Sequence, residues 1–156
     1  MSLRFALVVA TDPALWTTSE QLAAIRRRDL GSAELLDAQL ARIERLDPQV
    51  NAVCTLSVDD ARVRAAAADE ATAKGQSWGP LHGVSITVKD AIATAGIRTT
   101  GGSPELLDNV PQHDAEAVAA VKRAGAIVFG KTNRIWPALV MPALLVALQL
   151  TFGRSA

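Results

Sequence analysis

Residues 79–100 read GPLHGVSITVKDAIATAGIRTT, and this segment indicates the architecture of the chain. It opens with a glycine–proline loop and continues with the β-branched run VSITV at 84–88. Lys89 and Asp90 come next, before a glycine- and threonine-rich stretch at 94–103. A β-branched run bounded by loop residues predicts a short strand. Lys89 and Asp90 are therefore expected at the end of a strand, beside a loop.

Helices are predicted on both sides of this strand. They cover residues 19–29, with Thr18 as N-cap and Gln21 as its capping-box partner; 32–46, begun by Ser32 and ended by Asp47-Pro48; the alanine-rich run 59–74, ended by Gly75; and 114–123, capped by Asp114. Two further apolar runs, 52–56 and 126–129, predict short strands. This order predicts an α/β fold, in which N-terminal helices precede the first strands of a mixed sheet with flanking helices.

The composition limits the classes of protein to which the chain can belong. It has 156 residues, enough for one modest domain, and 49% of them are hydrophobic, which argues against intrinsic disorder. Sixteen basic residues balance sixteen acidic ones, so the charge gives no indication of a nucleic-acid partner. Cys54 is the single cysteine, which excludes a disulfide within the chain and favours a reducing, cytoplasmic location. Two histidines, His82 and His113, are too few to indicate a metal site.

Residues 125–132, GAIVFGKT, match the phosphate-loop pattern G-x-x-x-x-G-K-[ST]. Such a loop follows a strand, curls its backbone amides around phosphates and leads into a helix. Here the four central residues are apolar and strand-forming, and Pro137 stands where the first turns of the following helix belong. We therefore favour a helix ending in Gly125 followed by a buried strand, and keep nucleotide binding as a lesser alternative.

Two other groups of residues are candidates for nucleophilic chemistry. Ser103 follows two glycines, and a Ser–His–Asp set can be written from Ser103, His113 and Asp114. No G-x-S-x-G elbow is present and Pro104 follows the serine directly, so a glycine-rich turn is the favoured interpretation. Cys54 lies in an apolar run and is expected to be a small buried hydrophobe.

Lys89 is the strongest candidate for catalysis. At the end of an apolar strand and beside a glycine-rich loop, its ammonium is expected to be partly desolvated, which favours the neutral amine. A neutral lysine can act as a general base towards a serine hydroxyl. The ordinary alternative is a strand-end lysine that simply reaches into solvent.

Several segments together closely resemble the amidase signature family, the serine hydrolases that use a Ser–cis-Ser–Lys triad. These segments are residues 79–100, GGSPEL at 101–106 and HDAEAVAAVKRAGAIVFGKTN at 113–133. The helical segment from residue 12 is also similar to the family. The resemblance therefore covers residues 12–133, with residues 80–90 as its specific part. By this resemblance Lys89, within VKD, falls on the catalytic lysine of the family.

The resemblance implies a reaction and a class of substrate. The lysine acts as a base on a bridging serine, which in turn deprotonates a nucleophilic serine. The nucleophile attacks the carbonyl of a small-molecule amide, forms an acyl-enzyme and releases ammonia or an amine. Water then completes hydrolysis, whereas amidotransferase members pass the ammonia to another acceptor. No cofactor is implied, and the substrate does not follow from these residues. We favour a single-chain amidase and keep a fragment of an amidotransferase subunit as the lesser alternative.

Two departures from the family pattern stand out. Ser85 occupies a position where the family usually has proline, a change expected to alter little because it lies inside the strand. The second departure is larger, because the family's glycine- and serine-rich segment with both catalytic serines is expected well downstream of Asn133. Residues 135–156 instead begin with the uncharged run IWPALVMPALLVALQLTF. We therefore expect an amidase portion at 12–134 and a divergent hydrophobic tail at 135–156.

This division predicts a chain that is truncated before both serines and inactive by itself. The alternative is a non-catalytic interaction or membrane-associated relic, anchored by the tail. The tail is marginal in length for a bilayer span and contains two prolines, so membrane association is the less favoured interpretation.

Overall fold

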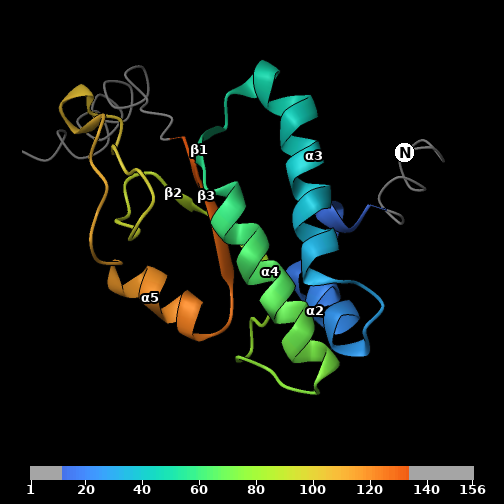
Figure 1. Cartoon of the computed structure of the whole chain (residues 1–156). Helices are drawn as coiled ribbons and strands as arrows, with labels where there is room; N and C mark the ends of the chain where they lie inside the picture. Colours follow the sequence, from blue (N-terminus) through green and yellow to red (C-terminus); the bar gives the residue numbers. More distant parts are fainter. Residues whose placement is uncertain (1–11, 134–156) are drawn as a thin grey trace, which may run out of the picture.

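The computed structural model describes residues 12–133, which form helices α2 to α5, two short 3₁₀ turns and three strands (Figure 1). In chain order these elements are η1 Pro13–Leu15, α2 Thr18–Arg27, α3 Ser32–Val50, β1 Val53–Leu56, α4 Val58–Ala73, β2 Ser85–Lys89, η2 Pro104–Leu106, α5 Glu116–Arg123 and β3 Ile127–Thr132. The predicted α/β class, with helices before the first strands, is confirmed.

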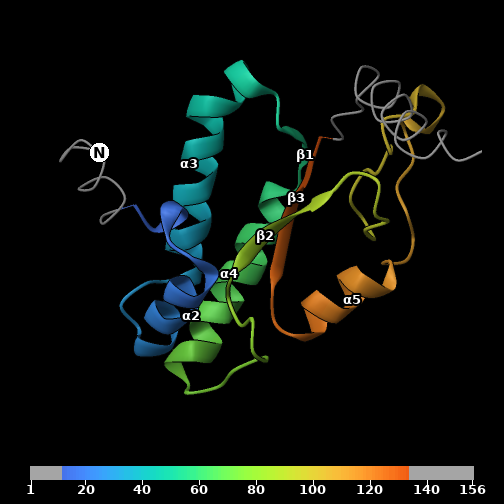
Figure 2. The ribbon, with the colours of Figure 1, turned by 180° about the vertical axis from the view of Figure 1, so that it is seen from behind.

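The three strands make one mixed sheet in the order β1-β3-β2. The central strand β3 is antiparallel to β1 and parallel to β2. The backbones of β1 and β3 lie close together at Gly130. A Cβ added there would lie 2.7 Å from the Thr55 carbonyl oxygen. A parallel pair needs a crossover connection, which is residues 90–126 with α5. Figures 1 and 2 show α2 and α3 on one side of the sheet and α5 on the other.

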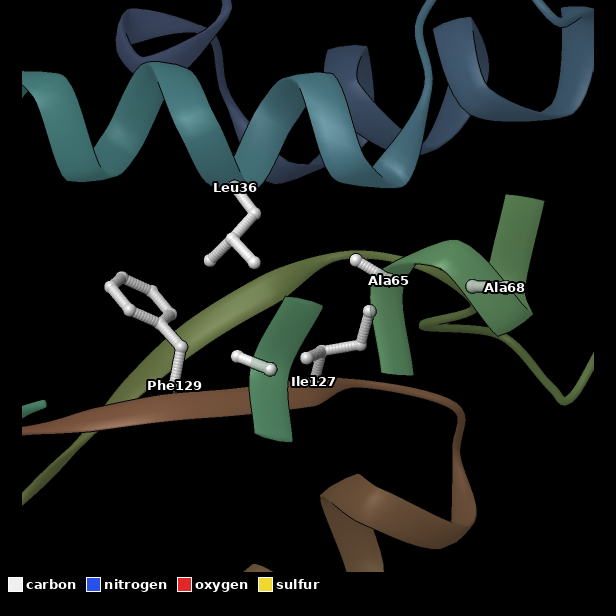
Figure 3. Packing of buried hydrophobic residues seen from close by; sticks show 6 residues of the cluster. Leu36, Ala65, Ala68, Ile127 and Phe129 are labelled. Carbon is white, nitrogen blue, oxygen red and sulfur yellow. The ribbon is translucent and has the colours of Figure 1, made fainter. Parts of the chain in front are cut away.

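The larger part of the core lies between the sheet and helices α3 and α4. Leu36 of α3 meets Ile127 and Phe129 of β3, and all three side chains are buried (Figure 3). Between them α4 presents a face of small residues, with Ala61, Ala65 and Ala68 buried. Small side chains let α4 approach the strand closely, which is why an alanine-rich helix serves here. A second cluster joins α2, α3 and the start of β2 through buried Ile25, Leu35 and Val84.

Several predicted helix boundaries are wrong, and each has a local cause. Helix α2 is capped by Thr17, one residue before the predicted Thr18, in a capping box with Glu20 rather than Gln21. Helix α3 does not stop at Asp47-Pro48 but runs to Val50. Asn51 ends it in the left-handed conformation, and the Asp47 carboxylate accepts hydrogen bonds from the next backbone amides, at Ala52 and Val53.

The predicted cap of the last helix is also wrong. Helix α5 begins at Glu116 after Ala115, which has no capping side chain. The Asp114 carboxylate instead accepts the Ala95 amide at 2.8 Å and pairs with the Lys122 ammonium at 2.8 Å. The last strand was predicted at 126–129, but β3 continues to Thr132.

The N-terminus of α3 is capped from another helix. Ser32 was predicted to begin and cap this helix, but it is the first helical residue, and its buried hydroxyl has no hydrogen-bond partner among residues 12–133. The preceding residue, Gly31, has no side chain to serve as a cap. The Asp69 carboxylate of α4 accepts the Ser32 amide at 2.6 Å and the Ala33 amide at 3.1 Å. A carboxylate at this end also complements the helix dipole.

This cap gives a test of how α3 and α4 are held together. Replacing Asp69 with alanine removes both hydrogen bonds, and we expect the free energy of unfolding to fall by about 1–2 kcal/mol. Asp69→Asn keeps an acceptor without the charge and is expected to lose less. The matched control is Glu70→Ala on the exposed side of the same helix, which should change stability little. Urea denaturation measures all three, and equal effects of Asp69→Ala and Glu70→Ala would contradict the cap.

Candidate active site

Lys89 stands at the carboxyl end of β2, as the sequence predicts. It is paired in register with Thr132 of β3, and its carbonyl accepts the Ile92 amide at 3.0 Å, which starts a turn. Its side chain is exposed and has no hydrogen-bond or ion-pair partner among residues 12–133. The expected partial desolvation of Lys89 is therefore wrong for the described part of the chain, because the strand end faces solvent there.

Asp90, next to Lys89, points the other way and is buried. Its carboxylate accepts the Thr100 hydroxyl at 2.5 Å and the Thr100 amide at 3.1 Å. Burial alone would raise the pKa of Asp90. However, the hydrogen bonds from Thr100 and from the Gly102 amide, together with the Lys131 charge, lower that pKa below its ordinary value. Asp90 thus closes residues 91–99 into a loop whose two ends meet beside Lys89.

The glycine-rich turn after this loop is not a nucleophile site in the described residues. Gly101 and Gly102 have φ angles of 59° and 76°, a left-handed conformation that glycine adopts without strain. No hydrogen bond among the residues described joins Ser103, His113 and Asp114. The Asp114 carboxylate is engaged with Ala95 and Lys122 instead, and His113 is exposed. The favoured interpretation of residues 101–103 as a turn is confirmed.

The phosphate-loop match does not form a loop. Residues 127–132 of the pattern are strand β3 itself, as the favoured interpretation of the sequence predicts. Gly125, before the strand, has a φ of 98° and packs against the backbone of His82, where a Cβ would lie 2.9 Å from the His82 Cα. Nothing in this segment presents the curled backbone amides that phosphates need.

Lys131 is the residue that reasoning from the sequence missed. It is fully buried, and its ammonium donates to the Ile92 carbonyl, the Thr94 hydroxyl and the Thr99 hydroxyl. Burial lowers the pKa of Lys131, and the nearby Asp90, Cys54 and Asp114 oppose that shift. The available signal was the position of this lysine inside an apolar strand, two residues after Phe129.

Cys54 on β1 is half-buried, and its thiol lies 3.5 Å from the Lys131 carbonyl oxygen as a donor. Burial raises the pKa of this thiol, and the negative charge of Asp90 raises it further. A raised pKa disfavours the thiolate, which agrees with the interpretation that Cys54 is not a nucleophile.

Ser85 has partners that explain how the strand accommodates it. Its hydroxyl donates to Gln39 Oε1 at 2.6 Å, and Gln39 Nε2 donates to the Ser85 carbonyl at 3.3 Å. The pair of hydrogen bonds ties α3 to the start of β2, the strand that carries Lys89. The Ser85 hydroxyl therefore has a hydrogen-bond partner within the fold.

His82 holds the turn that leads into β2. Its Nδ1 accepts the Trp78 backbone amide at 3.1 Å, so the ring proton resides on Nε2, which donates to the Thr72 hydroxyl at 2.9 Å. The ring also meets the Trp78 indole edge-on, with centroids 5.1 Å apart. Among residues 12–133 no group of histidine, cysteine and carboxylate side chains is arranged to hold a metal ion.

No helix within residues 12–133 combines the length and the apolar character needed to cross a membrane. The hydrophobic run 135–152, on which the prediction of membrane association rests, lies outside the described residues.

Comparison with known proteins gives consistent matches. The family model named Amidase matches residues 34–141. A glutamyl-tRNA(Gln) amidotransferase subunit of Roseiflexus sp. (strain RS-1) is 45% identical over 117 residues, which are 75% of this chain and 24% of that protein. The native peptide amidase of Stenotrophomonas maltophilia aligns with a TM-score of 0.70 and 37% identity, over 81% of this chain and 25% of that one.

Fatty acid amide hydrolase aligns with a TM-score of 0.73 at 22% identity, a likeness that shows the fold alone. The chain spans about a quarter of the length of the relatives it matches. The family match begins inside α3 and continues past residue 134. The boundaries expected from the sequence, 12–134 and 135–156, stay a prediction.

His82 gives a pH test of the turn before β2. Burial lowers the pKa of His82 below its ordinary value of 6.5, so the unfolded chain binds the proton first as the pH falls. Above about pH 6.5, His82 is neutral in the folded and in the unfolded chain. As the pH falls from about 6.5 through the pKa of the folded state, the stability that depends on the neutral ring is lost. We expect the free energy of unfolding to drop in this range, and His82→Gln to flatten the drop.

The matched control for this experiment is His113→Gln, which changes an exposed histidine and should keep the pH dependence of the natural chain. Chemical denaturation at a series of pH values measures the free energy of unfolding of each variant as a function of pH. The same slope in His82→Gln as in the natural chain would show that His82 is not the titrating group.

Proposed function

This chain belongs to the amidase family, and on that basis we propose that it contributes the lysine of an amide-cleaving site, with Lys89 as the base. The reaction is the cleavage of the carbon–nitrogen bond of a carboxylic amide, through a serine that Lys89 activates by way of a second, bridging serine. The substrate class is a small-molecule amide, and the proposed chemistry needs no cofactor.

The observation that carries this proposal is the placement of Lys89. It stands at the carboxyl end of a strand in a parallel pair, exposed and without a partner among residues 12–133. In sheets with parallel strands, ligand-binding and active sites usually lie at the carboxyl ends of the strands. A neutral Lys89 amine there would take a proton from the bridging serine, which would then take the proton of the nucleophile.

An exposed ammonium must lose contact with water before it can serve as a base, because desolvation favours the neutral amine. Residues 12–133 leave Lys89 exposed, so they do not supply that desolvation. By the family resemblance, both serines come from a segment downstream of Asn133. We propose that in a complete family member this segment also covers the lysine, so that base and serines are brought together in one step.

The sequence after Asn133 holds one serine, Ser155, and no glycine- and serine-rich run. We therefore propose that this chain by itself does not turn over amides. Loss of a nucleophile or of the donors that stabilise the oxyanion costs orders of magnitude in rate.

The direct test is to assay the purified chain on simple aliphatic and aromatic amides. We expect release of ammonia or amine no faster than in buffer. Lys89→Ala is the matched variant, because it removes only the proposed base. Turnover by the natural chain that disappears in Lys89→Ala would contradict the proposed inactivity and would at the same time support Lys89 as the base.

A second candidate function is a portion of a transferase that passes ammonia on. The curated relatives from Roseiflexus and Geobacter metallireducens, 45% and 46% identical, are both glutamyl-tRNA(Gln) amidotransferase subunits. The peptide amidase is less similar, at 37% identity. In an amidotransferase the same lysine would serve the same bond cleavage, and the ammonia would be passed to an acceptor instead of being released.

Grafting tests the role of Lys89 directly. Residues 12–133 would replace the corresponding N-terminal segment of the Stenotrophomonas maltophilia peptide amidase, and hydrolysis of a peptide amide would be followed. We expect activity in the chimera and a loss of about a thousandfold or more in Lys89→Met. The control is Lys74→Met, which removes the exposed lysine just after α4 and should leave the rate unchanged.

An active chimera that tolerates Lys89→Met would overturn the assignment of the base. A parallel chimera in the Roseiflexus protein separates the two candidates. Activity in that framework, with a folded but inactive peptide-amidase chimera, would favour the amidotransferase function.

A further inference from the structure

Lys131 is the largest fully buried side chain in the described part of the chain. Its ammonium donates to the Ile92 carbonyl at 2.5 Å, to Thr94 Oγ1 at 2.8 Å and to Thr99 Oγ1 at 3.1 Å. An ammonium has three N–H donors, so each has an acceptor. A buried charge with every donor used is held in one position, unlike a lysine that reaches into solvent.

The acceptors of Lys131 all lie in the segment that follows Lys89. The Ile92 amide donates to the Lys89 carbonyl at 3.0 Å, and the Ile92 carbonyl accepts the Lys131 ammonium. Ile92 is thus held by Lys89 through its amide and by Lys131 through its carbonyl. The next residue of β3 adds a further link, because the Thr132 carbonyl accepts the Asp90 amide at 3.0 Å.

We propose that Lys131 is a positioning residue, whose buried ammonium holds the turn that begins at Lys89 and so fixes where the Lys89 side chain leaves the end of β2. The role rests on the proposed function of Lys89 as the base. Lys131 touches no reacting atom in this scheme and acts through Ile92, Thr94 and Thr99.

Burial, and to a smaller extent the Lys122 charge, lower the pKa of Lys131, while the carboxylates of Asp90 and Asp114 favour its charged form. Asp90 is itself fastened to Thr100, so the loop 91–99 is held by Lys131 from within and by Asp90 at its end. The two groups together close the loop on the sheet edge that carries Lys89.

Removing the ammonium would leave the buried hydroxyl oxygens of Thr94 and Thr99 without their donor, and the Ile92 carbonyl with the Thr94 hydroxyl alone. Such orphaned groups are relieved by admitting water, which opens the loop locally. The helices α2, α3 and α4 pack through two apolar clusters that do not include Lys131. A positioning role therefore predicts loosening confined to the turn and the loop, with the rest of the fold retained.

Nuclear magnetic resonance of the full chain is a suitable test, because the sequence has only four lysines, Lys74, Lys89, Lys122 and Lys131. With lysine labelled at Cε and Nζ, each gives one resolvable signal. In Lys131→Met we expect shifts of the Lys89 amide and ε signals. Amide hydrogen exchange at Ile92, Ile97 and Thr100 should rise about tenfold or more, while protection in α3 and α4 persists.

The matched control is Lys122→Met. It removes another lysine of the same charge network, which pairs with Asp114 but donates nothing to the turn. We expect the Lys89 signals and the exchange at Ile92 to stay as in the natural chain. Unchanged Lys89 signals in Lys131→Met, or equal effects of the two substitutions, would overturn the proposal.

A rescue experiment covers the case in which Lys131→Met does not fold. In a Cys54→Ala background, Lys131→Cys is alkylated with bromoethylamine in denaturant and refolded, which restores an ammonium on a side chain of nearly the same length. Recovery of the Lys89 signals and of slow exchange at Ile92 in the alkylated chain alone supports the proposal. An alkylated chain that fails to recover them, when Cys54→Ala itself shows them, overturns it.

These measurements do not depend on turnover. A chimera with intact Lys89 turn signals that tolerates Lys89→Met would remove the proposed function and leave the hold of Lys131 on the turn standing. Conversely, if Lys131→Met leaves the Lys89 turn signals unchanged while the chimera's activity depends on Lys89, the positioning role is overturned and the proposed function stands.

Discussion

The parallel pairing of β2 with β3 constrains the path of nearly all the chain that follows β2. Parallel neighbours cannot be joined by a tight turn, so residues 90–126 must leave the end of β2, cross the sheet and return to the start of β3. The same pairing brings the carboxyl ends of both strands to one edge. Lys89 and Thr132 become neighbours there, although 43 positions separate 89 from 132 in the chain.

The layer of helices is adapted to this small sheet. Helix α4 offers alanines to β3, so Leu36 of α3 reaches Ile127 and Phe129 across it (Figure 3). Polar links then set the helices in register with the sheet and with each other. Asp69 of α4 caps α3, and Gln39 of α3 bonds to Ser85 at the start of β2. Because a hydrogen bond has a preferred geometry, each link restricts how the two elements can lie relative to each other.

The two lysines at this sheet edge lie in different environments. Lys131 is buried and each of its donors has an acceptor, so it is fixed and unavailable for proton transfer to a substrate. Lys89 is exposed and free of partners among residues 12–133, so it is available to a segment that packs against this edge. Under the proposed function, the Lys131 ammonium would hold the turn in place while the Lys89 amine takes part in proton transfer.

Local sequence was enough to predict most of the elements and to indicate the family. The β-branched run at 84–88 and the alanine-rich run at 59–74 specify a strand and a helix locally, and the motif around Lys89 carried the resemblance. Hydrophobic pattern and chain order also sufficed to place Lys89 at a strand end. The partners, in contrast, emerged only from the folded chain: Asp69 for α3, Asp114 for Lys122, and Thr94 and Thr99 for Lys131. Most of these bonds join residues more than thirty positions apart, and sequence periodicity carries no information about which distant groups meet. It was likewise the folded strand end, open to water, that left Lys89 exposed where the local pattern had predicted partial burial.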